Sequence, residues 1–145
     1  MLSPRWILAC GVFDLLHVGH VRYLQAARAL GDRLKVAVAP DEFCLARKGR
    51  RPTIPGAQRL ELIRALACVD AAEYMLSSLD DTAVAAAWIS AWGIHCVAVG
   101  ADWQGSPRWL RLEPALAQHG IAVRFLPRTA GVSTSAILAK IRASS

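Results

Sequence analysis

Apolar and polar residues follow one another along this chain in two patterns, one typical of helices and one of buried strands. Between residues 18 and 30 the apolar positions recur about every third residue and a glycine follows, which predicts a helix. Residues 94–99 form a largely apolar run between two glycines, which predicts a strand buried on both faces. The two patterns alternate from one end of the chain to the other.

This alternation predicts one domain over residues 1–145, a doubly wound, Rossmann-like α/β sandwich around a five-stranded parallel sheet. Ser133 is expected to cap the last helix. Strands are expected at 6–10, 34–39, 72–76, 94–99 and 121–126, and helices at 18–30, 56–67, 82–92, 109–119 and 133–141. Such sheets bind ligands at the carboxyl ends of their strands, where the strand order reverses.

Composition and charge limit the classes of protein to which this chain can belong. An apolar fraction of 54% and a charged fraction of 19% exclude a disordered chain, and no apolar stretch approaches the length of a membrane span. Residues 1–10 have no long apolar region, so we expect no leader peptide, a cytoplasmic protein and no membrane partner. A net charge of +6 favours an anionic partner, either a nucleic acid or a small phosphorylated molecule.

The four cysteines, at positions 10, 44, 68 and 96, are widely separated and form no C-x-x-C pair. We therefore expect reduced thiols and no metal site built from these side chains.

Residues 11–20 carry the strongest chemical signal. His17 and His20 lie three residues apart at a predicted helix start, so both imidazoles are expected on one side of its first turn, beside free amide groups. Gly19 between them leaves room for a ligand to approach the backbone. This arrangement suits a polyphosphate. The alternative is that the histidines only cap the helix or pack.

Two further segments follow later strands. Ser133 and Thr134 offer hydroxyls and free amides at a helix start, and Gly131 allows a tight turn, so an anion site or a simple cap is expected there. In residues 100–105, Trp103 offers a stacking face and Asp102 a hydrogen-bond acceptor, although a packed turn is the ordinary alternative.

Cations gather in residues 47–51, which we expect to be a loop within the stretch 41–55 that follows the second strand. Arg47, Lys48, Arg50 and Arg51 repel one another, so the loop is either flexible and solvated or closes over a triphosphate. Arg59, at the start of the next helix, is either a phosphate ligand or a surface residue.

The pattern G-x-F-D-x-x-H-x-G-H at residues 11–20 resembles the signature of the cytidylyltransferase-like nucleotidyltransferases, which is related to the H-I-G-H motif of class I aminoacyl-tRNA synthetases. The resemblance implies that His17 and His20 contact the triphosphate and stabilise charge that develops at the α-phosphorus. It implies that Gly11, Phe13 and Asp14 position the nucleotide. Val12 stands where a threonine is common, so one hydroxyl contact is missing.

Residues 128–134 and 100–105 resemble R-T-x-G-I-S-T and G-x-D-W-x-G of the bacterial glycerol-3-phosphate cytidylyltransferases. This resemblance implies a homodimer, formed partly around Val69 and Asp70, and a divalent cation such as Mg²⁺ on the nucleotide. It also implies a catalytic cation at Lys48, with Arg47 as its rival, a second at Arg128, and an acceptor-phosphate contact at Arg59. The nucleotide-binding residues it implies are Gly11, Val12, Phe13, Asp14, Gly19, Gly100, Asp102, Trp103, Thr129, Gly131, Ser133 and Thr134.

One departure affects the substrates. Ala67 stands where the glycerol-3-phosphate enzymes carry an arginine that recognises the acceptor phosphate, and residues 48–70 also resemble the heptose-phosphate adenylyltransferases. The leading hypothesis is CMP transfer from CTP to a small phosphorylated alcohol, with glycerol-3-phosphate as default. Its alternative is AMP transfer from ATP to a sugar phosphate. A basic nucleic-acid-binding module and a nucleotide sensor without turnover are the other hypotheses.

The central expectation is geometric. The histidine pair and residues 128–134 must face one cavity if a single nucleotide is to contact both.

Overall fold

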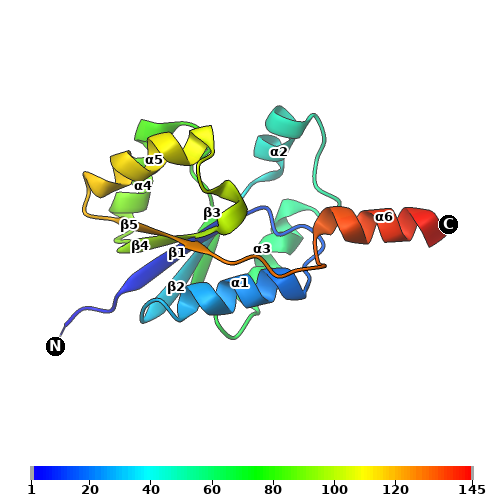
Figure 1. Ribbon diagram of the computed structural model, residues 1–145, viewed down its shortest axis with the longest axis horizontal. Helices are drawn as coiled ribbons and strands as arrows, with labels where there is room; N and C mark the ends of the chain where they lie inside the picture. Colours follow the sequence, from blue (N-terminus) through cyan, green and yellow to red (C-terminus); the bar gives the residue numbers. More distant parts are fainter. Residues whose placement is uncertain (1, 145) are drawn as a thin grey trace.

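The computed structural model describes residues 2–144, which form an α/β sandwich around one sheet (Figure 1). The strands are β1 (Trp6–Gly11), β2 (Arg33–Val38), β3 (Ala71–Tyr74), β4 (Cys96–Gly100) and β5 (Ala122–Leu126). The helices are α1 (Val18–Arg28), α2 (Asp41–Lys48), α3 (Gly56–Arg64), α4 (Thr82–Ala91), α5 (Pro107–Ala117) and α6 (Thr134–Ser144), with a short 3₁₀ helix η1 (Ala101–Trp103) after β4.

The sheet is parallel throughout, in the order β3-β2-β1-β4-β5. The order reverses between β1 and β4, so the carboxyl ends of these two strands form the crevice in which such sheets bind ligands. The predicted fold class is confirmed.

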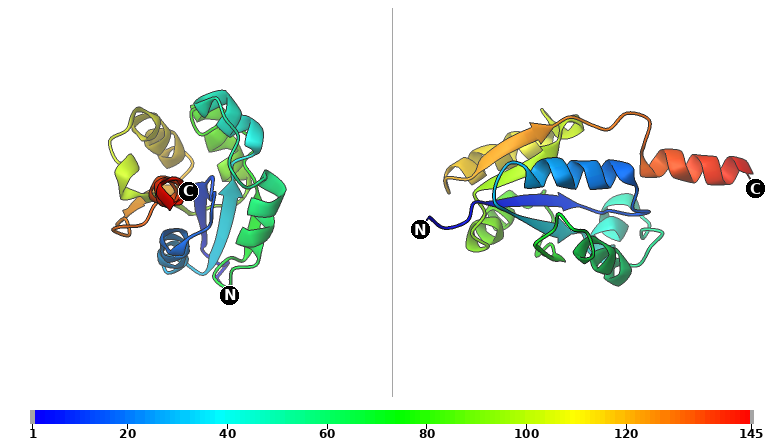
Figure 2. Two further views of the ribbon diagram at one scale, coloured as in Figure 1. Left: turned by 90° about the vertical axis from the view of Figure 1, so that its right-hand side faces the viewer. Right: turned by 90° about the horizontal axis from the view of Figure 1, so that it is seen from below.

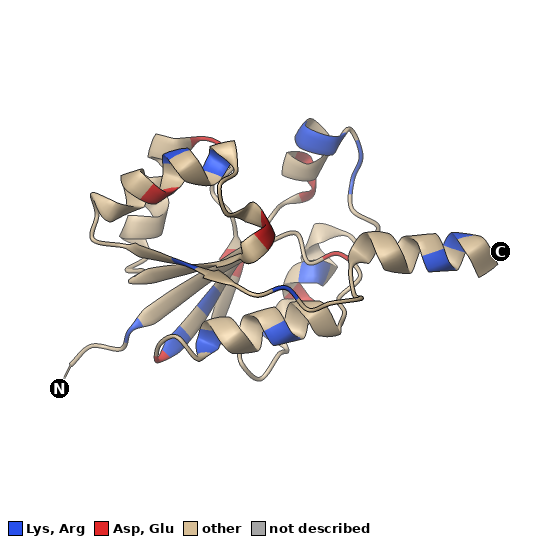
Figure 3. Cartoon of the chain, viewed as in Figure 1, with Lys and Arg blue, Asp and Glu red and all other residues tan. Residues whose placement is uncertain are grey.

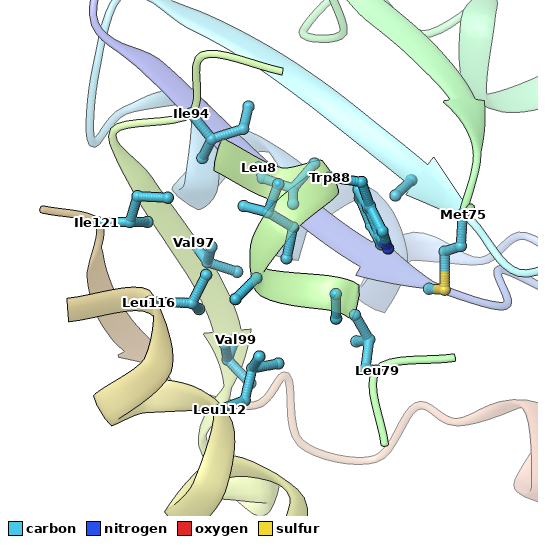
Figure 4. Close-up of a cluster of buried hydrophobic side chains, with 14 of the residues drawn as sticks. Leu8, Met75, Leu79, Trp88, Ile94, Val97, Val99, Leu112, Leu116 and Ile121 are labelled. Carbon is cyan, nitrogen blue, oxygen red and sulfur yellow. The ribbon is translucent and has the colours of Figure 1, made fainter. Parts of the chain in front are cut away.

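Side chains of β1 alternate between two cores because successive residues of a strand point to opposite faces. Leu8 packs with α4 and α5, in a cluster whose buried side chains Figure 4 shows. Ile7 and Ala9 pack on the other face with Leu24 of α1 and Ile63 of α3. Figure 2 shows the sheet between these two helical layers.

The main correction to the predicted elements is α2, which forms where no helix was predicted and includes the first two residues of the expected basic loop, Arg47 and Lys48. Pro40 is its extended N-cap, Asp41 and Glu42 occupy its first turn, and Arg47 and Lys48 occupy its last. Negative charges at the start of a helix and positive charges at its end interact favourably with the helix dipole, so these side chains stabilise α2. Gly49 ends it with a φ of 73°, a conformation that glycine adopts without strain.

Helix α6 extends away from the sheet, beyond its carboxyl edge (Figure 1). Between residues 2 and 144, no helix has the length and apolar character needed to cross a membrane.

Candidate active site

His17 and His20 form a reciprocal cap at the start of α1. The Gly19 amide donates to Nδ1 of His17 at 3.1 Å, and the His17 amide donates to Nδ1 of His20 at 3.2 Å. The two rings stack with centroids 3.7 Å apart and an angle of 21° between their planes. The two histidines therefore cap the helix, and their rings also lie on the same side of its first turn, as predicted.

This cap fixes where each imidazole carries its proton. A backbone amide only donates, so Nδ1 of each ring is the bare acceptor and the proton lies on Nε2. Burial lowers the pKa of His17, and burial with the neighbouring His17 lowers the pKa of His20 to about 4, despite the opposing Asp14 carboxylate. Near pH 7 both rings are neutral and each has one Nε2–H group to donate.

The two rings face a cavity of about 370 Å³, here called cavity A, at the carboxyl ends of β1, β4 and β5. It brings the histidine pair together with segments more than 80 and 110 residues later, as the central expectation required. Its lining residues are His17, Gly19, His20, Tyr23, Gly100, Ala101, Asp102, Trp103, Pro127, Arg128, Thr129, Val132, Ser133 and Thr134.

The far wall of cavity A is the start of α6. Ser133 caps this helix as predicted, since its hydroxyl accepts from the Ala136 amide at 3.0 Å. The Thr134 hydroxyl donates to the carbonyl of Asp14 at 3.0 Å and so ties α6 to the turn after β1. Across the cavity mouth Arg128 pairs with Asp102 at 3.2 Å, with both side chains more than half exposed.

The turn after β1 is held by its own backbone and by Asp14. Phe13 and Leu15 have φ angles of 56° and 49°, which side chains of this size rarely adopt. The Asp14 carboxylate accepts from the amides of Thr53 and Ile54 at 2.8 and 2.9 Å. Asp14 thus joins this turn to the segment before α3, and both of its oxygens already have partners.

At two of the glycines predicted to bind the nucleotide, neighbouring side chains of the protein leave no space for a Cβ. A Cβ at Gly19 would lie 2.9 Å from the His17 ring, and one at Gly11 would lie 3.0 Å from the Phe13 ring. Gly19 also lines cavity A, so its predicted contact with a ligand stays a prediction. Gly100 differs, since no atom lies within 4 Å of its added Cβ.

Arg59 is the clearest correction among the predicted site residues. Its side chain is fully buried, which rules out a surface residue, and it donates to the carbonyls of Val12, Ala39 and Ile54 at 2.7–2.9 Å. It also pairs with Asp41 at 2.7 Å. Four of the five guanidinium N–H groups are therefore engaged. Arg59 is placed to hold the site together rather than to receive an acceptor phosphate.

A second cavity of about 370 Å³, here called cavity B, lies on the β2 side of cavity A. His20, Tyr23, Gly100 and Trp103 line both cavities. Cavity B contains the predicted Gly11, Val12, Phe13 and Lys48, and Arg47 lines it too. Gly131 and Asp14 line neither cavity.

Figure 3 shows positive residues at the end of α2 and along the chain after it, and two of them, Arg47 and Lys48, line cavity B. Two guanidinium groups lie over the Trp103 ring, that of Arg47 at 5.2 Å from its centroid and that of Arg108 at 4.6 Å. Arg108 in turn makes two hydrogen bonds to Asp80. Tyr23 and Arg108 line cavity B but were not predicted as site residues. Tyr23 lies in the periodic pattern of a helix, and Arg108 follows a glycine-rich turn, and neither position indicates a functional role by itself.

Among residues 2–144 no group of three or more histidine, cysteine or acidic side chains lies close enough to hold a metal ion. Mg²⁺ in nucleotide sites usually keeps several waters and uses substrate phosphates as ligands, so a cation carried by a triphosphate fits this donor set.

Comparisons with known proteins agree on one family. A family model described as cytidylyltransferase-like matches residues 8–140. The bifunctional protein HldE of Halorhodospira halophila is 38% identical over 141 residues, covering 97% of this chain and 28% of that protein. The FAD synthase of Thermococcus onnurineus is 55% identical over 64 residues, covering 44% of this chain and 43% of that protein. The chain spans less than half the length of these two relatives.

A solved structure has the same fold. The lipopolysaccharide core biosynthesis protein from Thermoplasma volcanium is 28% identical, with a TM-score of 0.68, and the match covers 88% of this chain and 98% of that one.

Proposed function

The chain belongs to the cytidylyltransferase-like family, and we propose that it transfers a nucleotidyl group from a nucleoside triphosphate to a small phosphate ester. This family is the one expected from the sequence, and its class of enzyme is the nucleotidyltransferases. The observation that carries the proposal is cavity A, where two Nε2–H donors and the start of α6 face one space.

In this reaction an oxygen of the acceptor phosphate forms a bond to the α-phosphorus. The bond from that phosphorus to the bridging oxygen breaks, and pyrophosphate leaves with the electron pair. The protein contributes position and charge stabilisation rather than a nucleophile. His17 and His20 donate from Nε2 to phosphate oxygens, and the amides at the start of α6 provide a second anion site. Mg²⁺ bound to the triphosphate supplies further neutralisation of its charge.

Cavity B is the proposed place of the acceptor. It meets cavity A at His20 and Trp103, so an acceptor phosphate at this border lies beside the histidine pair. Lys48 and Arg47 at its mouth draw the anionic acceptor and the triphosphate towards the site. Arg128 and Thr129 contact the nucleotide from the other side.

We place ATP first as the donor and CTP second. Relatives named FAD synthase support ATP, because FAD contains an adenylyl unit. The resemblance of Asp102–Trp103 and Arg128–Thr129 to the glycerol-3-phosphate cytidylyltransferases supports CTP.

The test is pyrophosphate release with each of the four nucleoside triphosphates against a panel of phosphorylated alcohols. We expect ATP to give the highest rate, and a higher rate with CTP would reverse the order. A protein carrying both His17→Asn and His20→Asn should release at least a hundredfold less pyrophosphate, because asparagine can replace the Nδ1 acceptor of each cap but has no group at the position of the Nε2–H donor. Undiminished release by this variant would contradict the proposed site.

A further inference from the structure

We propose that the acceptor taken by cavity B is a phosphate monoester with an aromatic, largely apolar body, and not a polyol or sugar phosphate. This inference rests on the proposed function, since it concerns the second substrate of the same site. It follows from which hydrogen-bonding groups the cavity offers and which it lacks.

The described residues that line cavity B include no aspartate, glutamate, asparagine or glutamine. The sequence as a whole contains no asparagine. These four side chains are the usual partners of sugar and glycerol hydroxyls, because they accept hydrogen bonds in fixed directions. A polyol placed here would lose its bonds to water and find few side-chain acceptors to replace them, which is costly.

Several of the other polar groups that line the cavity already have partners within the protein. Tyr23 donates its hydroxyl to the Ala98 carbonyl at 2.6 Å, and the carbonyls of Val12 and Ala39 accept from Arg59. The Ser78 hydroxyl accepts from the Asp80 amide at 3.1 Å. Burial raises the pKa of the Cys10 thiol to about 12, so this group stays uncharged.

The cavity walls suit a flat apolar body. The rings of Phe13, Phe43, Trp103 and Trp109 line it, and Met75 and Leu79 belong to the buried cluster beneath it (Figure 4). Aromatic rings and a flexible methionine favour stacking and edge contacts with another ring. The cations lie at the mouth, on α2, where a phosphate on such a body would meet them.

The test compares four acceptors with the preferred nucleotide: naphthylmethyl phosphate and benzyl phosphate against glycerol 3-phosphate and glucose 1-phosphate. We expect kcat/KM at least tenfold higher for the aromatic pair. Equal values, or a preference for the polyol pair, would overturn the inference while pyrophosphate release itself upholds the proposed function.

Binding measured without turnover separates the proposed acceptor class from the proposed nucleotidyl transfer. Equilibrium dialysis should show the two aromatic phosphates binding the protein at least tenfold more tightly than glycerol 3-phosphate. Failure of the aromatic phosphates to bind would overturn the inference. Absence of nucleotide binding in the same assay would count against the proposed function instead.

Two variants address the cavity directly. Met75→Gln places an amide in the apolar wall and should raise KM for the aromatic acceptor at least fivefold, with the nucleotide Kd unchanged. Leu76→Gln is its matched control, because Leu76 is 64% exposed and does not line the cavity. Phe43→Leu removes a half-buried ring and serves if the first variant folds poorly. An unchanged KM in the folded variants would overturn the inference.

Discussion

At the scale of single residues, His17 combines two roles through its two ring nitrogens. Nδ1 accepts from the Gly19 amide and caps α1, while Nε2 keeps its proton in a ring that lines cavity A. Asparagine is a good N-cap residue but has no equivalent of the second nitrogen. Substitution therefore separates the structural role from the proposed catalytic one.

We expect His17→Asn to unfold at nearly the same urea concentration as the natural protein but to lose at least a hundredfold in kcat. His17→Ala should lose activity and also about 1 kcal/mol of unfolding free energy, because the cap is gone. Urea unfolding and pyrophosphate release measure the two effects. Full activity in His17→Asn would show that Nε2–H plays no part.

Arg59 acts through buried hydrogen bonds that join the ends of β1 and β2 to the segment before α3. We expect Arg59→Met to lower the unfolding free energy by about 3 kcal/mol, since it leaves carbonyls and Asp41 without their partner. The control is Arg64→Met on the same helix, where one hydrogen bond to Ala72 is lost at an exposed site. Similar losses in both variants, measured by urea unfolding, would contradict this role.

At the scale of elements, α2 forms from residues whose charges can favour either a loop or a helix. The cations that favour a solvated loop by their repulsion also stabilise a helix when they fall in its last turn, and acidic residues occupy its first turn. The helix matters for function because it presents Lys48 and Arg47 at the mouth of cavity B.

The end of α2 can be tested at Gly49, whose φ of 73° disfavours a side chain. Gly49→Ala should cost about 1 kcal/mol of unfolding free energy and raise KM for the triphosphate, as the last turn frays. Gly49→Asn is the control, since asparagine tolerates this conformation better. Equal KM values for both variants and the natural protein would mean that the helix end does not position these cations.

At the scale of the whole molecule, the depressed pKa of His20 links stability to pH. The folded state releases the His20 proton at about pH 4, whereas an unfolded chain releases it near 6.5. Between these values the unfolded chain binds more protons, so stability falls as pH falls from 6.5 towards 4. Arginine partners lower the pKa values of Asp41 and Asp80 against the opposing effect of burial, so the stability that these two carboxylates contribute is lost only below this window.

We therefore expect the urea midpoint to drop between pH 7 and pH 5, and to drop less in His20→Gln, which has no proton to gain. Unfolding series at the two pH values measure the difference. Identical drops in both proteins would show that His20 does not carry the effect.

The homodimer expected from the family resemblance stays a prediction. Asp70, in the segment expected at its interface, accepts from the Leu34 amide at 2.8 Å and pairs with Arg28 at 3.3 Å within the chain. Analytical ultracentrifugation should give twice the chain mass of 15.7 kDa if the dimer forms, and a mass of one chain would contradict it.

The sequence by itself determined those features that depend on residues close together in the chain. The alternation of strand and helix patterns gave the parallel α/β class, because side-chain period sets which faces can be buried. The spacing of His17 and His20 placed both rings on one turn, and Ser133 capped α6 as expected, because caps form within three residues.

Only the tertiary structure decided what depends on segments far apart. Arg59 has carbonyl partners up to 47 residues away, so no local pattern distinguishes its burial from exposure. Cavity B is assembled from the ends of β1, β2 and β4 with α2 and α5, and bonds that long-range packing creates engage its Tyr23 hydroxyl and its Ala39 carbonyl. These bonds cannot be predicted from local sequence patterns, because each forms only when the sheet brings distant segments together.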